Sequence, residues 1–136
     1  MRLKSLTYVS QAAPDLSERD LVEIHEAARH LNALDGVTGL LVFDGKRFLQ
    51  IIEGAEEAID DLTGRLRRDQ RHSGLEIRDE RLIDDRSFPD WSMELLKVDA
   101  GYTNAPHEMA AFLPKTATPA ISELAMRMTA ELSASS

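Results

Sequence analysis

The sequence predicts an α+β fold in which two helices cover one face of a mixed five-stranded sheet. Three observations support this prediction: segments in the order β-α-β-β-α-β with one further strand, an Asp-Gly pair between two apolar runs, and two helical stripes of apolar residues. This order of elements is the ferredoxin-like arrangement. A chain of 136 residues with 43% hydrophobic residues is long enough to bury such a core.

The first strand is expected over residues 2–10, where alternation places Tyr8 on one face. Ser17 is then expected to cap a helix, because an acidic residue follows it three positions later. Gly36 ends this helical segment. Its apolar stripe consists of Leu21, Ile24, Ala28 and Leu31.

Residues 37–53 form a predicted hairpin, since Asp44-Gly45 suits the positive φ angles of its turn. A second helix is expected over residues 56–68. The runs LEIRDERLI and SMELLKV predict two more strands, separated by a turn around Pro89.

The end of the chain differs in composition, with no strand signal and many Ala, Thr, Ser and Pro residues. Thr118 and Pro119 suit the cap and first position of a helix, which must pack either on its own sheet or on a partner. Its stripe is Ile121, Leu124, Ala125, Met128 and Leu132. We therefore divide the chain into a core domain, residues 1–98, and a helical extension, residues 99–136.

Charge and composition exclude several classes of function. The net charge of -8 argues against nucleic-acid binding, which needs a basic surface. The chain has no cysteine, hence no disulfide or thiol chemistry. Because it shows neither a signal-peptide core nor an apolar run of membrane-spanning length, a soluble cytoplasmic protein is expected, with no membrane partner.

Common catalytic motifs are missing as well. The sequence has no Gly-x-Ser-x-Gly elbow, phosphate loop or dinucleotide glycine pattern, and its four histidines lack metal-ligand spacing. The basic run RLRRDQRH has two interpretations that the sequence leaves open. It is either a helix end whose cations favour the macrodipole, or an anion site in which Arg65 and Arg71 hold a phosphate.

Three polar residues interrupt otherwise apolar elements: Tyr8, Asn32 and Gln50. Taken singly, each is satisfied by backbone groups in most folds. In the predicted topology, however, strands one and three are neighbours, so Tyr8 and Gln50 both project toward the helices, with Asn32 above them. A phenol and two amides around an apolar site suit a flat heteroaromatic ligand with alternating donors and acceptors.

Four segments, in order and at close to family spacing, resemble the BLUF domain, the flavin-based blue-light sensor. They are LTYVSQA, ARHLNALDGVTGLLVFDGKRFLQIIEG, RDQRH and RSFPDWSM, and the resemblance covers residues 2–98.

The resemblance implies a flavin between helices one and two, sandwiched by Ile24 and Leu66, with Asn32 at its polar edge. Tyr8 corresponds to the electron donor of the family, and Gln50 to the switching glutamine. The residues expected at the ribityl and phosphate end are Arg65, Asp69, Arg71 and His72. Trp91 and Met93 correspond to the pair on the last strand that relays the switch.

Three positions depart from the family pattern. Leu31 stands where relatives often have a polar residue, Ala28 replaces a frequent serine, and Gln70 a frequent proline. These differences concern the tuning of the site.

The resemblance further implies a photoreceptor with no enzymatic activity, which binds FAD, with FMN and riboflavin as alternatives. Residues 99–136 leave no room for an enzymatic output domain. We therefore expect the terminal helices to pack on the sheet face opposite the flavin, and the output to act through a separate downstream protein or a change in self-association as a homo-oligomer. The alternatives are a small ferredoxin-like hydrolase of the acylphosphatase type and a light-independent interaction module.

Overall fold

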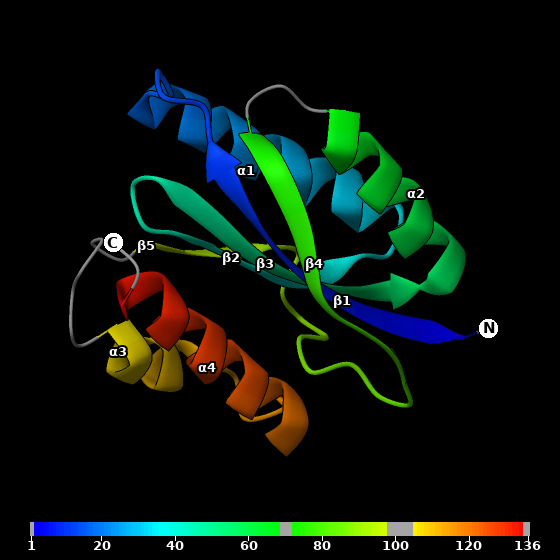
Figure 1. Cartoon of the computed structure of the whole chain (residues 1–136). Coiled ribbons are helices and arrows are strands. Elements are labelled where there is room, and N and C mark those ends of the chain that lie inside the picture. Colours follow the sequence, from blue (N-terminus) through cyan, green and yellow to red (C-terminus); the bar gives the residue numbers. More distant parts are fainter. Residues whose placement is uncertain (1, 69–71, 98–104, 135–136) are drawn as a thin grey trace.

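The structure is a computed structural model that describes residues 2–68, 72–97 and 105–134. Two helices lie on one face of a sheet and two on the other, which gives three layers (Figure 1). In chain order the elements are β1 (Leu3–Ala12), α1 (Glu18–Leu34), β2 (Thr38–Phe43), β3 (Arg47–Ala55), α2 (Glu56–Arg68), β4 (His72–Ile83), β5 (Glu94–Lys97), α3 (Ala105–Phe112) and α4 (Pro119–Ala134).

The strands form one five-stranded sheet in the order β4-β1-β3-β2-β5. β1 pairs antiparallel with β3 and β4, and β2 pairs antiparallel with β3, whereas β2 and β5 are parallel. The sheet is therefore mixed, and β1 and β3 are neighbours inside it. Both features confirm the predicted ferredoxin-like arrangement.

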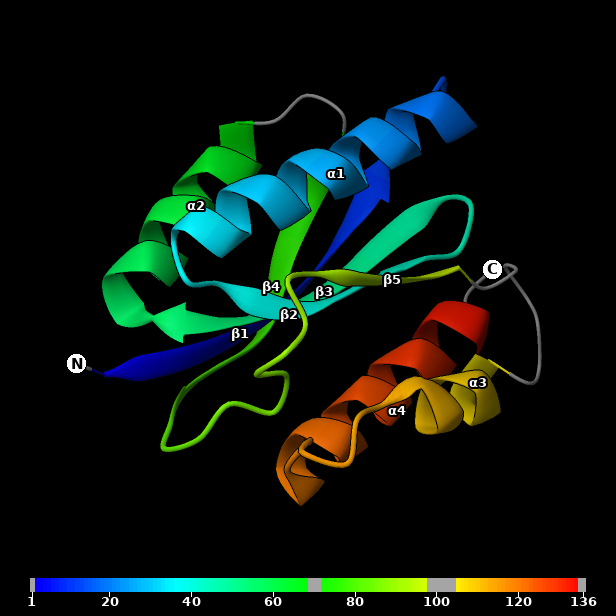
Figure 2. The same ribbon diagram turned by 180° about the vertical axis from the view of Figure 1, so that it is seen from behind.

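Both faces of the central strands β1, β2 and β3 are largely buried. We call them the α1–α2 face and the α3–α4 face after the helices that cover them (Figure 2). Successive residues of β2 and β3 alternate between the faces, which explains why their apolar runs are nearly continuous. The strands supply Leu6, Tyr8, Leu41, Phe48 and Ile52 to the α1–α2 face, and Leu40, Val42, Leu49 and Ile51 to the α3–α4 face.

Two short-range signals in the sequence act as predicted. Ser17 Oγ accepts the N–H of Asp20 at 3.1 Å, and Asp20 Oδ2 accepts the N–H of Ser17 at 3.0 Å. This reciprocal pair fixes the start of α1. At the other end of the chain, α4 begins at Pro119, directly after Thr118.

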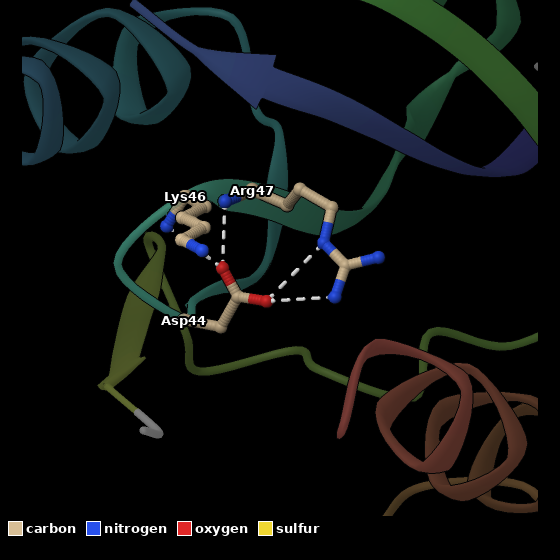
Figure 3. Close-up of polar contacts among 3 residues, drawn as sticks. All are labelled: Asp44, Lys46 and Arg47. Atoms are coloured by element: carbon tan, nitrogen blue, oxygen red, sulfur yellow. Dashed lines mark hydrogen bonds and ion pairs between the residues drawn. The ribbon is translucent and has the colours of Figure 1, made fainter. Parts of the chain in front are cut away.

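The hairpin between β2 and β3 is held by a buried carboxylate (Figure 3). Asp44 Oδ1 accepts the N–H groups of Lys46 at 2.9 Å and Arg47 at 2.6 Å. Its second oxygen pairs with the Arg47 guanidinium at 3.1 Å. Gly45, at φ 95°, provides the positive φ that the predicted turn requires.

The last strand differs from the prediction. β5 begins at Glu94, so Trp91 and Met93 precede this strand instead of lying on it. Met93 has φ 144°, a value outside the strand region for a residue with a side chain, and regular pairing therefore starts only after it. The bounds of α3 were also not predicted from the sequence.

Candidate functional site

Tyr8 and Gln50 lie directly opposite each other on the central strands β1 and β3. The Tyr8 hydroxyl donates a hydrogen bond to Gln50 Oε1, and both side chains are buried, at 3% and 4% exposure. The predicted meeting of these two residues on the α1–α2 face is therefore observed.

The other end of the Gln50 amide contacts Met93. Gln50 Nε2 donates to Met93 Sδ at 3.2 Å, and Met93 is fully buried in the α1–α2 cluster. A thioether is a weak acceptor, so this bond holds the amide less firmly than the bond to Tyr8 does. The chain Tyr8–Gln50–Met93 thus has one strong and one weak link.

Trp91 lies on the opposite side of the sheet from Met93. Its ring contacts Phe88, with centroids 5.5 Å apart, and Phe112 of α3, with centroids 5.0 Å apart. In a regular strand two residues at this spacing share a face. The positive φ of Met93 accompanies a break in this alternation, so Trp91 and Met93, two residues apart, reach opposite buried faces.

Two apolar side chains from different helices pack against the buried cluster that contains Tyr8 and Met93. Ile24 of α1 and Leu66 of α2 are both half-buried and pack against the α1–α2 cluster. The helices that carry them lie side by side over the same sheet face (Figures 1 and 2).

Arg65, on α2 next to Leu66, forms ion pairs with Asp35 at 3.2 Å and Asp61 at 3.7 Å. Its Nε atom is nevertheless buried and has no hydrogen-bond acceptor within the part of the chain that the structure describes. A buried donor of this kind normally finds an acceptor, and the carboxylate of Asp61 lies 3.7 Å from this Nε, within ion-pair distance but beyond hydrogen-bond distance.

The remaining predicted site residues are not placed by the structure. Asn32 belongs to α1 and His72 begins β4, but their side chains lie outside the described residues. Asp69 and Arg71 lie outside them altogether, so the predicted phosphate end of the site stays a prediction.

Two further residues of the site region were missed in the sequence. His25 of α1 bonds through Nε2 to the Met93 carbonyl oxygen at 2.7 Å. Glu53 of β3 is fully buried and accepts the N–H groups of Ser87 at 3.0 Å and Phe88 at 2.9 Å. Each joins segments that are far apart in the sequence, so no local pattern reveals it.

Burial raises the pKa of Glu53 above its ordinary value, against the lowering effect of the two N–H groups and of Arg86. Ser87, which Glu53 holds, is in turn bonded to the start of α4, because its Oγ accepts the N–H of Thr118 at 3.0 Å. Polar contacts therefore run from β3 to the α3–α4 helices.

Comparison with known proteins decides the family. The family BLUF, sensors of blue-light using FAD, matches residues 3–94. The chain belongs to the BLUF family. It is accordingly a sensor of blue light that uses a flavin, and the resemblance seen in the sequence is confirmed.

The chain covers only a small part of its curated relatives. The photoactivated adenylate cyclase subunit beta of Euglena gracilis is 33% identical over 113 residues, which are 82% of this chain and 12% of that protein. Subunit alpha of the same organism is 32% identical over 113 residues, 83% of this chain and 10% of that protein.

Solved BLUF structures confirm the fold over almost the whole chain. The dark-state structure of BlrB, a BLUF protein, is 33% identical with a TM-score of 0.73, and the match covers 96% of this chain and 98% of that one. The BLUF structure of BlrP1 is 29% identical with a TM-score of 0.81, covering 97% of this chain and 90% of that one.

The residues present fit a flavin. Half-buried Ile24 and Leu66 offer apolar surface for the two faces of a flat ring. Gln50 and Tyr8 offer an amide and a phenol for its polar edge, and the Arg65 guanidinium, paired here with Asp35 and Asp61, carries N–H donors that suit an acceptor-rich ligand.

No helix in the described ranges is long and apolar enough to cross a membrane. Within the same ranges, His, Asp and Glu side chains form no group of three or more that could hold a metal ion.

Proposed function

We propose that Tyr8 and Gln50 form the photoactive switch of this chain, with the flavin bound between α1 and α2. The observation that supports this most directly is the buried hydrogen bond from the Tyr8 hydroxyl to Gln50 Oε1, continued by the bond from Gln50 Nε2 to Met93. A two-ended amide between two different partners has two alternative bonding patterns, as a switch requires.

In this proposal Ile24 and Leu66 contact the two faces of the ring and Asn32 its polar edge. The remaining flavin-binding residues are Arg65, Asp69, Arg71 and His72. The proposed ligand is FAD, because the family is described as using FAD. FMN is the alternative, since one structure of Klebsiella pneumoniae BlrP1 contains FMN.

When bound, an isoalloxazine ring that has absorbed blue light supplies a strong one-electron oxidant. Tyr8 donates the electron, and its hydroxyl proton passes to Gln50, to which it is already bonded. Electron and proton then return to Tyr8, so no net oxidation occurs. The lasting change is the orientation or tautomer of the Gln50 amide, which gives up its bond to Met93.

The output is proposed to be mechanical and to involve no substrate turnover. Trp91 and Met93 belong to one segment but contact opposite sheet faces, so a change at Gln50 alters the packing of Trp91 on Phe112 of α3. We propose that the helices of residues 99–136 pass this change to a separate downstream protein in the cytoplasm, with the chain acting as a homo-oligomer.

Absorption spectroscopy of the purified protein tests the switch. Blue light should shift the flavin band to the red, and the shift should decay in darkness. Tyr8→Phe and Gln50→Leu should bind flavin yet lose the shift, whereas Asp44→Asn, in the hairpin turn, should keep it. A normal photocycle in Tyr8→Phe or Gln50→Leu would refute the assignment.

A further inference from the structure

His25 makes a contact that the switch described above does not use. It lies on α1 next to Ile24, is half-buried, and bonds through Nε2 to the backbone oxygen of Met93 at 2.7 Å. The sulfur of the same residue accepts the Gln50 amide. A single residue thus receives one bond from α1 and another from the switching glutamine.

The direction of the His25 bond follows from chemistry. A carbonyl oxygen only accepts, so His25 Nε2 must carry the hydrogen. Both the neutral ring in its Nε2–H tautomer and the protonated ring satisfy this requirement. The contact therefore needs a donor at this position and does not need a charge.

The backbone conformation of Met93 must be held in place by contacts with its surroundings. Its φ of 144° is rare for a residue with a side chain, and conformations of this kind persist only where surrounding contacts impose them. Backbone contacts from two neighbouring elements, β2 and α1, help to hold the segment here. Trp91 O accepts the N–H of Gly39 on β2 at 2.9 Å, and Met93 O accepts from His25 on α1.

The first of these contacts requires a residue without a side chain at position 39. A Cβ at this position would lie 1.9 Å from the Ile51 oxygen, so no other residue fits. The Gly39 contact fixes Trp91, and the His25 bond acts on the backbone of Met93 itself.

We propose that His25 is a positioning residue that holds the Met93 sulfur against the Gln50 amide in darkness and thereby sets the lifetime of the light state. This inference rests on the proposed switch. If His25 already holds Met93 in the transition state for recovery, loss of the bond raises that barrier, and return to the dark arrangement is slower. Losing one such hydrogen bond should slow dark recovery about five-fold.

The side chain at position 25 can be varied in a matched series. Glutamine carries an N–H donor at Nε2, the same number of bonds from Cα as in histidine, and it has no ring and no charge. Asparagine carries the same amide one bond shorter. Leucine has similar bulk but no donor.

Dark recovery of the red-shifted band is measured in His25→Leu, His25→Asn and His25→Gln. The leucine and asparagine variants should recover about five-fold more slowly, and the glutamine variant should return to the wild-type rate within about two-fold. Lys97→Gln is the control, because it breaks the exposed 2.9 Å ion pair between Glu18 of α1 and β5 without touching Met93. It should change the rate less than about two-fold.

A dark measurement separates this inference from the proposed switch. The methyl resonance of Met93, identified by its loss in Met93→Leu, should move in His25→Leu and return in His25→Gln, whether or not the protein has a photocycle. Wild-type recovery and an unmoved Met93 resonance in His25→Leu would overturn the positioning role, as would failure of glutamine to restore either value. Absence of a red shift in the wild type would instead refute the proposed switch.

Discussion

At the scale of single residues, Gln50 lies between a phenol and a thioether in an otherwise apolar layer. Phe48 and Ile52 flank it on the same strand face, at 4% and 0% exposure. They exclude the water that would otherwise satisfy the amide in many orientations, so the amide is limited to a few bonding patterns. A polar residue in this position is unfavourable for packing but necessary for a hydrogen-bond switch.

Glu53 gives a prediction of pH dependence. Its pKa is raised by burial from the ordinary value of 4.5, so the folded protein holds this proton to a higher pH than the unfolded chain does. Between pH 4.5 and the pKa of Glu53 in the folded protein, the contribution of Glu53 to the free energy of unfolding therefore falls as pH rises. Above that pKa the contribution is constant.

Glu53→Gln should remove this decline. It should also lower stability by about 1–3 kcal/mol, because an amide oxygen accepts only one of the two N–H groups well while its NH₂ faces the other. Urea unfolding over a pH series measures both effects, with Asp84→Asn as the exposed control. Parallel pH profiles for wild type and Glu53→Gln would contradict the assignment.

The sequence predicts that Tyr8 and Gln50 meet, because strand alternation and the predicted pairing of strands one and three together place them on one face. It does not predict the contacts of His25 or Glu53, whose partners are 68 and 34 residues away. The identity of a residue shows what it can donate or accept, but only the tertiary fold determines the partner.

At the scale of elements, local signals predict where α1, α2 and α4 begin, because caps and apolar stripes depend on neighbouring residues. The start of β5 is not predicted in this way. The run SMELLKV has strand composition throughout, yet the φ angle of Met93 and its contacts with α1 and β3 delay pairing to Glu94. Long-range contacts override propensity at this point.

Helix α4 provides a matched pair of substitutions. Leu124, at 2% exposure, packs on the α3–α4 face, whereas Met126, at 36%, points outward. Leu124→Ala should lower the free energy of unfolding by about 2–5 kcal/mol through the cavity it leaves. Met126→Ala should change it by less than about 0.5 kcal/mol. Thermal or urea unfolding measures the difference, and equal values would show that α4 does not cover the sheet as described.

At the scale of the whole molecule, the proposed switch and the proposed output lie on opposite faces of one sheet. Gln50 and Met93 belong to the α1–α2 face, and Trp91 packs with Phe88 and Phe112 on the other. The segment before β5 joins Trp91 on one face directly to Met93 on the other. A light-driven rearrangement of Gln50 on the α1–α2 face should therefore loosen the helices on the α3–α4 face.

Hydrogen exchange measures this coupling. Illumination should accelerate amide exchange in α4, Pro119–Ala134, relative to darkness, because the packing of Trp91 on α3 changes. In Gln50→Leu, illumination should leave exchange unchanged. Equal protection of α4 in darkness and light in the wild type would exclude this route to the output.

Rearrangement of the Gln50 amide by light is tested most directly by infrared difference spectroscopy of protein labelled with ¹³C at the glutamine side-chain carbonyl. An isotope-sensitive amide carbonyl band should appear in the light-minus-dark spectrum and disappear at the rate of dark recovery. A red-shifted flavin band with a difference spectrum unaffected by the label would contradict it.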